Sequence, residues 1–180
     1  ALHGLIQTNT RDSHRVAVIG GGTIGLCTVI AAKYIGCEVD IYAKYDHQIE
    51  TAHELGAGEL NGKYDRVVDC VGNDETLNTS SKTAKPGSWI IILGITINGI
   101  NLPGMRVIMN EIKIFPSIMY SSTDGVKDFT IAAKVLATQP EIGKKIITHR
   151  FNLDEAEDAF AIAGDKNSKS IKVVFDPTLT

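Results

Sequence analysis

A short glycine-rich turn constrains the fold of this chain more than any other feature. Its sequence is V-I-G-G-G-T-I-G, which places Gly20, Gly22 and Gly25 in a G-x-G-x-x-G spacing. With 17 glycines in 180 residues such a spacing arises easily by chance, so the flanking segments decide its meaning. The apolar run over residues 16–19 is typical of a parallel strand buried on both faces. A helical repeat follows the turn and ends at Gly36, as expected of a glycine that terminates a helix.

Strand, turn and helix together predict a dinucleotide-binding motif in which each glycine has its own role. Gly20 permits the tight turn, Gly22 lets the backbone approach a pyrophosphate, and Gly25 lets the helix pack closely on the strand. The pyrophosphate would lie on free N–H groups at the positive end of the helix dipole. The alternative is a turn that joins strand to helix and binds nothing. The helical repeat is formed by Ile24, Cys27, Ala31 and Tyr34.

The rest of the chain alternates predicted strands with predicted helices. This alternation predicts an α/β fold with a doubly wound parallel sheet and right-handed crossovers. Strands are expected at 38–42, 66–71, 89–93, 112–118 (interrupted by Pro116), 146–148 and 171–175. Helices are expected at 46–55 with Asp46 as N-cap, at 74–84 before a stop at Pro86-Gly87, at 128–138, and from the capping box of Asn152 and Glu155 through residue 162.

Composition narrows the class of protein. The hydrophobic share of 43% and the charged share of 22% are ordinary for a soluble globular protein. A net charge of −3 offers no basic face for nucleic acid, and no apolar stretch approaches a membrane span. Residues 1–14 do not resemble a signal peptide, so we expect a cytoplasmic protein. Three widely spaced cysteines and five scattered histidines disfavour disulfides and a metal site within the chain.

Six segments, in family order and at consistent spacing, resemble the medium-chain, zinc-type alcohol and polyol dehydrogenases. They are R-V-A-V-I-G-G-G-T-I-G-L (15–26), A-H-E-L-G-A (52–57), V-V-D-C-V-G (67–72), K-P-G-S-W-I-I-I-L-G (85–94), I-T-H-R-F-N-L-D-E-A-E-D-A-F (147–160) and S-I-K-V-V-F (170–175). The resemblance implies a Rossmann-type domain that binds a nicotinamide cofactor and works with a separate catalytic domain. In the family, that catalytic domain supplies the zinc ligands and the proton relay, which this sequence lacks.

The resemblance also implies how the chain is organised. Residues 1–13 would form a linker and helix from the catalytic-domain side, and 14–139 the dinucleotide-binding domain. Residues 140–180 would return toward a catalytic domain that is missing here, as if a dehydrogenase had been truncated at its domain boundary. One departure is internal, because only residues 58–63 stand where the family has a strand and a further helix. That crossover should be reduced or absent.

Cofactor-binding residues follow from the same resemblance. The pyrophosphate would contact backbone N–H groups of Gly22, Thr23 and Ile24. The strand ends would wall the adenine and nicotinamide, and Lys172 would reach the pyrophosphate; the plainer alternatives are ordinary strand ends and a solvated lysine. The strand-end residues are Cys70, Val71, Gly72, Leu93, Gly94 and Ile95.

The end of the second strand bears on the choice between NAD and NADP. Rossmann domains that prefer NAD place an acidic residue there to bind the ribose 2′-hydroxyl. Alignment of G-C-E-V-D-I-Y-A-K puts Ala43 at this position, followed by Lys44, a pattern that favours a 2′-phosphate. Asp40 is the competing acidic candidate, about three residues earlier in the strand.

These observations predict the cofactor domain of an oxidoreductase that transfers a hydride between nicotinamide and an alcohol or carbonyl substrate. We expect NADP to be preferred, with NAD as the alternative cofactor, and zinc only in the absent domain. The chain alone should bind but not turn over, and copies of it would pair through the strand at 112–118. A stand-alone nucleotide-sensing module and a zinc-free quinone reductase of the same superfamily are the alternative functions.

Overall fold

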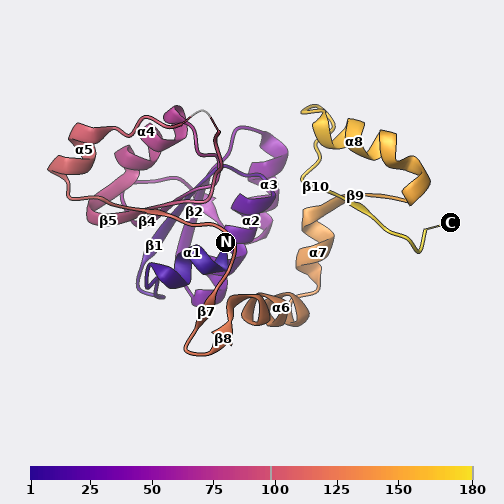
Figure 1. The fold of residues 1–180 in the computed structure, drawn as a ribbon, viewed down its shortest axis with the longest axis horizontal. Helices are drawn as coiled ribbons and strands as arrows, with labels where there is room; N and C mark the ends of the chain where they lie inside the picture. Colours follow the sequence, from indigo (N-terminus) through magenta and orange to yellow (C-terminus); the bar gives the residue numbers. More distant parts are fainter. Residues whose placement is uncertain (98, 180) are drawn as a thin grey trace. The chain divides into compact units, whose positions relative to one another are not determined.

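The computed structural model describes residues 1–97 and 99–179, which divide into two compact units (Figure 1). The first unit spans Ala1–Val135 and the second Leu136–Thr180. Helix α6 (Asp128–Thr138) crosses this boundary. Each unit is described by itself.

A parallel sheet of Rossmann type forms the centre of the first unit. Its strand order is β3-β2-β1-β4-β5-β6, so β1 lies in the middle and pairs with β2 on one side and β4 on the other. This order confirms the predicted doubly wound architecture. The strands are β1 (Arg15–Ile19), β2 (Glu38–Tyr42), β3 (Gly58–Glu59), β4 (Tyr64–Asp69), β5 (Ala84–Ile92) and β6 (Lys113–Pro116).

Helices alternate with these strands along the chain. The prediction for α2 is confirmed, including its end at Gly36, which adopts the left-handed conformation with a φ of 98°. A short antiparallel hairpin, β7 (Ser122–Thr123) and β8 (Val126–Lys127), precedes α6. The helices are α1 (Leu2–Gln7), α2 (Thr23–Ile35), α3 (Asp46–Glu54), α4 (Asp74–Thr83) and α5 (Gly104–Met109).

The core of the first unit is built on β1 and its neighbours. The four residues from Val16 to Ile19 are fully buried, as predicted for a strand covered on both faces. On α2 the buried face includes Leu26 and Val29, whereas Ile24 and Tyr34 of the predicted apolar repeat are about half exposed. The helix was therefore predicted correctly, but the repeat that revealed it is not the face that packs on the sheet.

Three local predictions need correction. Tyr45, not Asp46, is the N-cap of α3, and Asp46 lies in the first turn, where its charge favours the helix dipole. Pro86-Gly87 does not separate a helix from a strand, because β5 begins at Ala84 and runs through this pair with a register shift against β4. Between the strands predicted at 89–93 and 112–118 the structure has a further helix, α5, which was not predicted.

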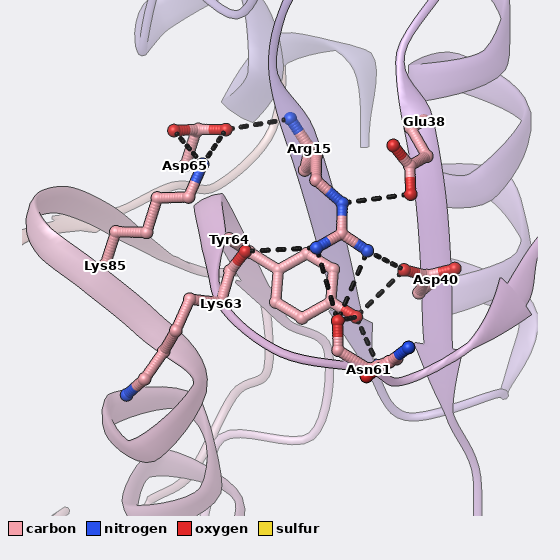
Figure 2. A network of polar contacts seen from close by, with 8 residues as sticks. All are labelled: Arg15, Glu38, Asp40, Asn61, Lys63, Tyr64, Asp65 and Lys85. Carbon is pink, nitrogen blue, oxygen red and sulfur yellow. Dashed lines mark hydrogen bonds and ion pairs between the residues drawn. The ribbon is translucent and has the colours of Figure 1, made fainter.

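The crossover between β3 and β4 is reduced, as expected. Four residues, Leu60–Lys63, connect the two strands without a helix. A polar network closes this short connection (Figure 2): the buried Tyr64 hydroxyl accepts from the Asn61 N–H at 2.5 Å and donates to Asp40 at 2.8 Å. Arg15 donates to Asp40 and to the Asn61 carbonyl, and its guanidinium lies 4.7 Å from the Tyr64 ring centre. Burial and the bond to Asp40 raise the pKa of the Tyr64 phenol.

The second unit contains a two-stranded parallel sheet and two helices. Its capping box is confirmed, since Asn152 and Glu155 bond reciprocally at the start of a 3-10 turn (Leu153–Glu155) that continues into α8 (Ala156–Gly164). Strands β9 (Ile147–Phe151) and β10 (Lys172–Phe175) pair in parallel. Helix α7 (Glu141–Ile146), with Pro140 as its N-cap, was not predicted.

Candidate functional site

The glycine turn after β1 separates glycines that the fold requires from one that it does not. Gly20 has a φ of 105°, and a Cβ there would lie 2.6 Å from the Val71 side chain. A Cβ at Gly25 would overlap the carbonyl oxygen of Gly20, so α2 packs directly on the turn. Gly22 differs, because its backbone suits any residue and a Cβ would meet no atom within 4 Å. The space in front of Gly22 is therefore open.

Gly22 is also the N-cap of α2, and as a glycine it has no side chain that could cap the first turn of this helix. The first N–H groups of a helix point toward its N-terminus and carry partial positive charge. A helix start with an open glycine in front of it suits a phosphate group. Thr23 and Ile24 are the first residues of the helix, and the Ile24 side chain is 49% exposed.

The end of β2 lies directly beside this turn. The Gly20 N–H donates to the carbonyl of Tyr42 at 2.8 Å, and a Cβ at Gly21 would lie 2.6 Å from the Ala43 Cβ. Ala43 is buried, while Lys44 is exposed with its ammonium 5.9 Å from the Tyr45 ring centre. The cation is therefore accessible at this corner, next to a small residue.

Asp40, the competing acidic residue, is committed to the crossover network instead. Its carboxylate accepts from Arg15 and Tyr64, and the residue is 7% exposed. It pairs with Gly58, the first residue of β3, and a Cβ at Gly58 would overlap the Asp40 side chain. This geometry supports Ala43 and Lys44 as the strand-end pair.

The ends of β4 and β5 meet each other and the glycine turn. A Cβ at Gly72 would lie 2.7 Å from the Gly94 backbone, and one at Gly94 would overlap Val71. The Cys70 thiol lies 3.6 Å from the Thr28 hydroxyl of α2, and burial raises its pKa to about 12, so the thiol is neutral near pH 7. The predicted strand-end residues of β4 and β5 therefore lie next to one another, and their contact with a cofactor stays a prediction.

Two of these strand-end side chains are exposed although they are apolar. Val71 is 41% exposed and Ile95 is 76% exposed. Exposed apolar side chains near a helix start that suits a phosphate are typical of a surface that binds a ligand with both charged and flat apolar parts.

Asp69 is a site residue that the sequence interpretation missed. It ends β4, is fully buried, and its carboxylate accepts from the N–H groups of Val71 and Gly72. An aspartate followed by a glycine three residues later is a signal for such a turn, and it was present in V-V-D-C-V-G. Lys172 lies on β10 in the second unit, so its contact with a pyrophosphate stays a prediction.

Two further searches of the described residues bear on the class of protein. Over residues 1–97 and 99–179, no three or more His, Cys, Asp or Glu side chains gather in a way that would hold a metal ion. In the same residues no helix combines the length and apolar character needed to cross a membrane. The described residues therefore do not provide the donor set for a zinc ion.

Comparison with known proteins gives a consistent result. A family described as zinc-binding dehydrogenase matches residues 58–138. The L-arabinitol 4-dehydrogenase of Aureobasidium melanogenum is 26% identical over 196 residues, covering 96% of this chain and 52% of that protein.

Two solved structures are similar as well. A putative zinc-binding dehydrogenase from Sinorhizobium meliloti 1021, bound to NADP, has a TM-score of 0.79 at 25% identity. The match covers 98% of this chain and 56% of that protein. Acetophenone reductase from Geotrichum candidum, in complex with NAD, has a TM-score of 0.79 at 18% identity, and the match covers 99% of this chain and 53% of that protein.

The resemblance to the zinc-type medium-chain dehydrogenases is confirmed. The chain spans about half the length of the curated relatives that it matches. Over that length the solved structures share the Rossmann-type sheet that forms the centre of the first unit.

Proposed function

We propose that this chain binds a nicotinamide dinucleotide at the carboxyl edge of β1, β4 and β5. The observation that carries the proposal is the contrast within the glycine turn. Gly20 and Gly25 are locked by their neighbours, whereas the helix start at Gly22 faces open space. Packing alone does not require a glycine at position 22, because any residue would fit there.

The residues divide the work of binding as follows. Backbone N–H groups at Gly22, Thr23 and Ile24 would hold the pyrophosphate, and the strand ends would wall the flat rings. When bound, the nicotinamide supplies hydride transfer, and the surrounding chain orients the ring and excludes water. In a complete oxidoreductase of this type the substrate would be an alcohol, polyol or carbonyl compound, whose oxygen is handled by residues outside this chain. The chain alone should bind the dinucleotide without turnover.

We further propose a preference for NADP(H) over NAD(H). Ala43 offers no carboxylate to a ribose 2′-hydroxyl, and the exposed Lys44 ammonium can pair with a 2′-phosphate. Asp46 is exposed two residues later and opposes a phosphate, which limits the preference. An exposed pair contributes roughly 0.2 to 1 kcal/mol, and a phosphate of nearly two charges somewhat more. We expect several-fold to about a hundredfold discrimination, at 1.4 kcal/mol per decade.

Calorimetric titration of the purified chain with NADPH and NADH tests both proposals. Gly22→Val should raise both dissociation constants at least about tenfold, because the new side chain fills the open cradle. The matched control is Gly104→Val at the start of α5, where a Cβ likewise meets no atom within 4 Å; its affinities should match the native chain. Unchanged affinity in Gly22→Val would show that the pyrophosphate lies elsewhere.

The same titrations with two more variants separate the cofactors. Ala43→Asp should reverse the ranking of NADPH and NADH, and Lys44→Ala should weaken NADPH alone. Lys127→Ala, an exposed lysine on β8, is the control for loss of one charge. The preference should also fade with salt, since exposed charges are screened over roughly 8 to 10 Å. Equal or tighter binding of NADH by the native chain would overturn the assignment of the strand end.

A nucleotide-sensing module and a zinc-free quinone reductase share this cradle with a zinc-type enzyme. Sequencing of the gene upstream of the codon for residue 1 would distinguish them, because ligand-spaced Cys, His and Glu codons in frame with this chain would establish the zinc-type enzyme.

We also propose that two copies pair along β6, which is an edge strand of the sheet. Large apolar side chains that are at least 65% exposed precede and follow this strand in the sequence: Met105, Ile108 and Met109 on α5, and Ile118, Met119 and Tyr120 after β6. A single-chain mass by light scattering at micromolar concentration would overturn this proposal.

A further inference from the structure

The short connection between β3 and β4 contains an asparagine followed directly by a glycine. Asn61 and Gly62 are both exposed. The contacts that hold Asn61 in the polar network of Figure 2 are made by its main chain, because the N–H donates to the Tyr64 hydroxyl and the carbonyl oxygen accepts from Arg15. These contacts do not involve the side-chain amide of Asn61.

Position 62 requires a glycine for its backbone conformation. Its φ is 89°, in the left-handed region that residues with a Cβ rarely adopt. The connection therefore keeps in place the dipeptide in which a main-chain nitrogen attacks the preceding side-chain amide most readily. No side chain shields the Gly62 nitrogen, and ring closure onto Cγ of Asn61 gives a five-membered succinimide.

Arg15 acts on the attacking group. The attacking species is the deprotonated Gly62 nitrogen, which shares its negative charge with the Asn61 carbonyl oxygen because both belong to one peptide group. That oxygen accepts from Nη1 and from Nη2 of Arg15, each at 3.2 Å. A guanidinium stays charged, and hydrogen bonds to the charged form of an acid favour that form. The Arg15 cation therefore favours loss of the proton from the Gly62 N–H.

We propose that Asn61-Gly62 is a self-modification site whose reaction is promoted by Arg15. Hydroxide from solvent takes the Gly62 amide proton, and the nitrogen forms a bond to Cγ of Asn61. The bond from Cγ to Nδ2 breaks, and the amide nitrogen leaves as ammonia with a proton from water. Water then opens the succinimide: addition at Cγ gives aspartate at position 61, and addition at the main-chain carbonyl carbon gives isoaspartate.

The two products affect the polar network differently. Aspartate leaves the course of the main chain unchanged, whereas isoaspartate inserts Cβ into it. Only four residues connect β3 to β4, so the added atom displaces the N–H and the carbonyl that Tyr64 and Arg15 hold. The isoaspartate form, separated by ion exchange, should unfold at a lower urea concentration than Asn61→Asp, which carries the same charge. Equal midpoints would overturn this effect on the network.

Peptide mapping by mass spectrometry measures the reaction in the purified chain kept at about pH 8. The peptide that contains residue 61 should gain one mass unit with time and split into aspartate and isoaspartate forms. Gly62→Ala should slow the conversion several-fold or more, because a Cβ shields the attacking nitrogen. The matched control is Gly87→Ala, at an exposed glycine that also has a positive φ (72°) and whose Cβ would meet no atom within 4 Å; conversion at Asn61 should be unchanged.

The sequence supplies an internal reference for the role of Arg15. A second Asn-Gly pair stands at 98–99, and residue 98 lies outside the described residues. Arg15→Gln should slow conversion at residue 61 several-fold relative to residue 98 in the same sample. Glu38→Gln weakens a contact of Arg15 Nε and leaves both bonds to the Asn61 carbonyl, so its ratio should stay within about twofold of native. If Arg15→Gln does not fold, Arg15→Lys, which keeps the charge on a single nitrogen, should give an intermediate ratio.

Absence of conversion at residue 61 in the native chain would overturn the site. Conversion in Arg15→Gln that is as fast as in the native chain, or faster, would overturn the promotion by Arg15. Neither outcome depends on dinucleotide binding, because Arg15 and Tyr64 begin β1 and β4, at the edge of the sheet opposite to the proposed cofactor site.

Discussion

The two units of this chain use the same local signals but bury their apolar residues very differently. In the first unit whole strands are inaccessible, with Val16, Val68 and Ile91 fully buried. In the second unit the buried apolar side chains include Ile142 and Ile146, while the larger Phe160 is 73% exposed. A segment of about 45 residues is too short to bury many apolar side chains in a core of its own, whatever the quality of its helices and caps. Local pattern decides which elements form, and chain length decides whether they close around a core.

Removal of one large apolar side chain from each unit should give the largest difference in stability between the two units. Ile91→Ala in β5 should lower the free energy of unfolding by about 2 to 5 kcal/mol, because it leaves a cavity in a closed core. Phe160→Ala in α8 should lower it by about 1 kcal/mol or less, the worth of its ring contact with Phe175 at 6.3 Å. Urea unfolding followed by circular dichroism measures both. Similar costs would mean that Phe160 is covered in solution.

Polar contacts provide a second, smaller contrast. Tyr64→Phe removes a buried hydroxyl and leaves the Asn61 N–H and the Asp40 carboxylate each short of a partner, so it should cost about 1 to 3 kcal/mol. Arg150→Ala in the second unit breaks a half-exposed pair with Asp176 at 3.3 Å and should cost about 1 kcal/mol or less. The same urea experiment applies. A cost for Arg150→Ala as large as that for Tyr64→Phe would contradict the distinction.

The smallest expected effect is a pH dependence of the first unit. Burial alone would raise the pKa of Asp65, but the hydrogen bonds from Lys85 and from the Arg15 N–H leave it below its usual 3.8. The unfolded chain therefore takes up this proton first as pH falls, and the stability that Asp65 provides above pH 3.8 is lost as pH drops through the folded pKa. For one partly exposed pair we expect about 1 kcal/mol or less.

Urea midpoints between pH 5 and pH 3 test this expectation. The native chain should lose more stability over that range than Asp65→Asn, which has no carboxyl group to titrate at this position. An identical pH profile for the two proteins would show that the Lys85 pair contributes nothing.

Sequence predicted the elements best where local signals agree with the tertiary structure. The predicted bounds 38–42 and 128–138 match β2 and α6, because an apolar strand and a helix of eleven residues each carry many signals of their own. Short elements were missed. Helix α5 has six residues, and its N-cap and first residue are Pro103 and Gly104, two residue types that are more typical of turns. A six-residue helix depends on contacts that are not local, so its pattern is weak.

In the candidate site, the sequence predicted the roles of those residues whose neighbours all belong to the same turn. The steric roles of Gly20 and Gly25 are confirmed, since both follow from a strand that runs directly into a helix. The contacts of Asp69 were out of reach in part, because its carbonyl oxygen accepts from the N–H groups of Leu93 and Gly94, more than twenty residues later in the chain. Which side chains of α2 face the sheet was also not determined by the apolar repeat, as the half-exposed Ile24 illustrates.

The shortened crossover after β3 has a further consequence for association of the chain with itself. An edge strand presents unpaired N–H and C=O groups that another strand can join, and long apolar edges promote aggregation. On this side the edge consists of two residues, a glycine and an exposed glutamate, followed at once by the turn to β4. Because only four residues remain to reach β4, the strand cannot lengthen. Loss of the crossover helix therefore leaves one side of the sheet with almost no template for strand addition.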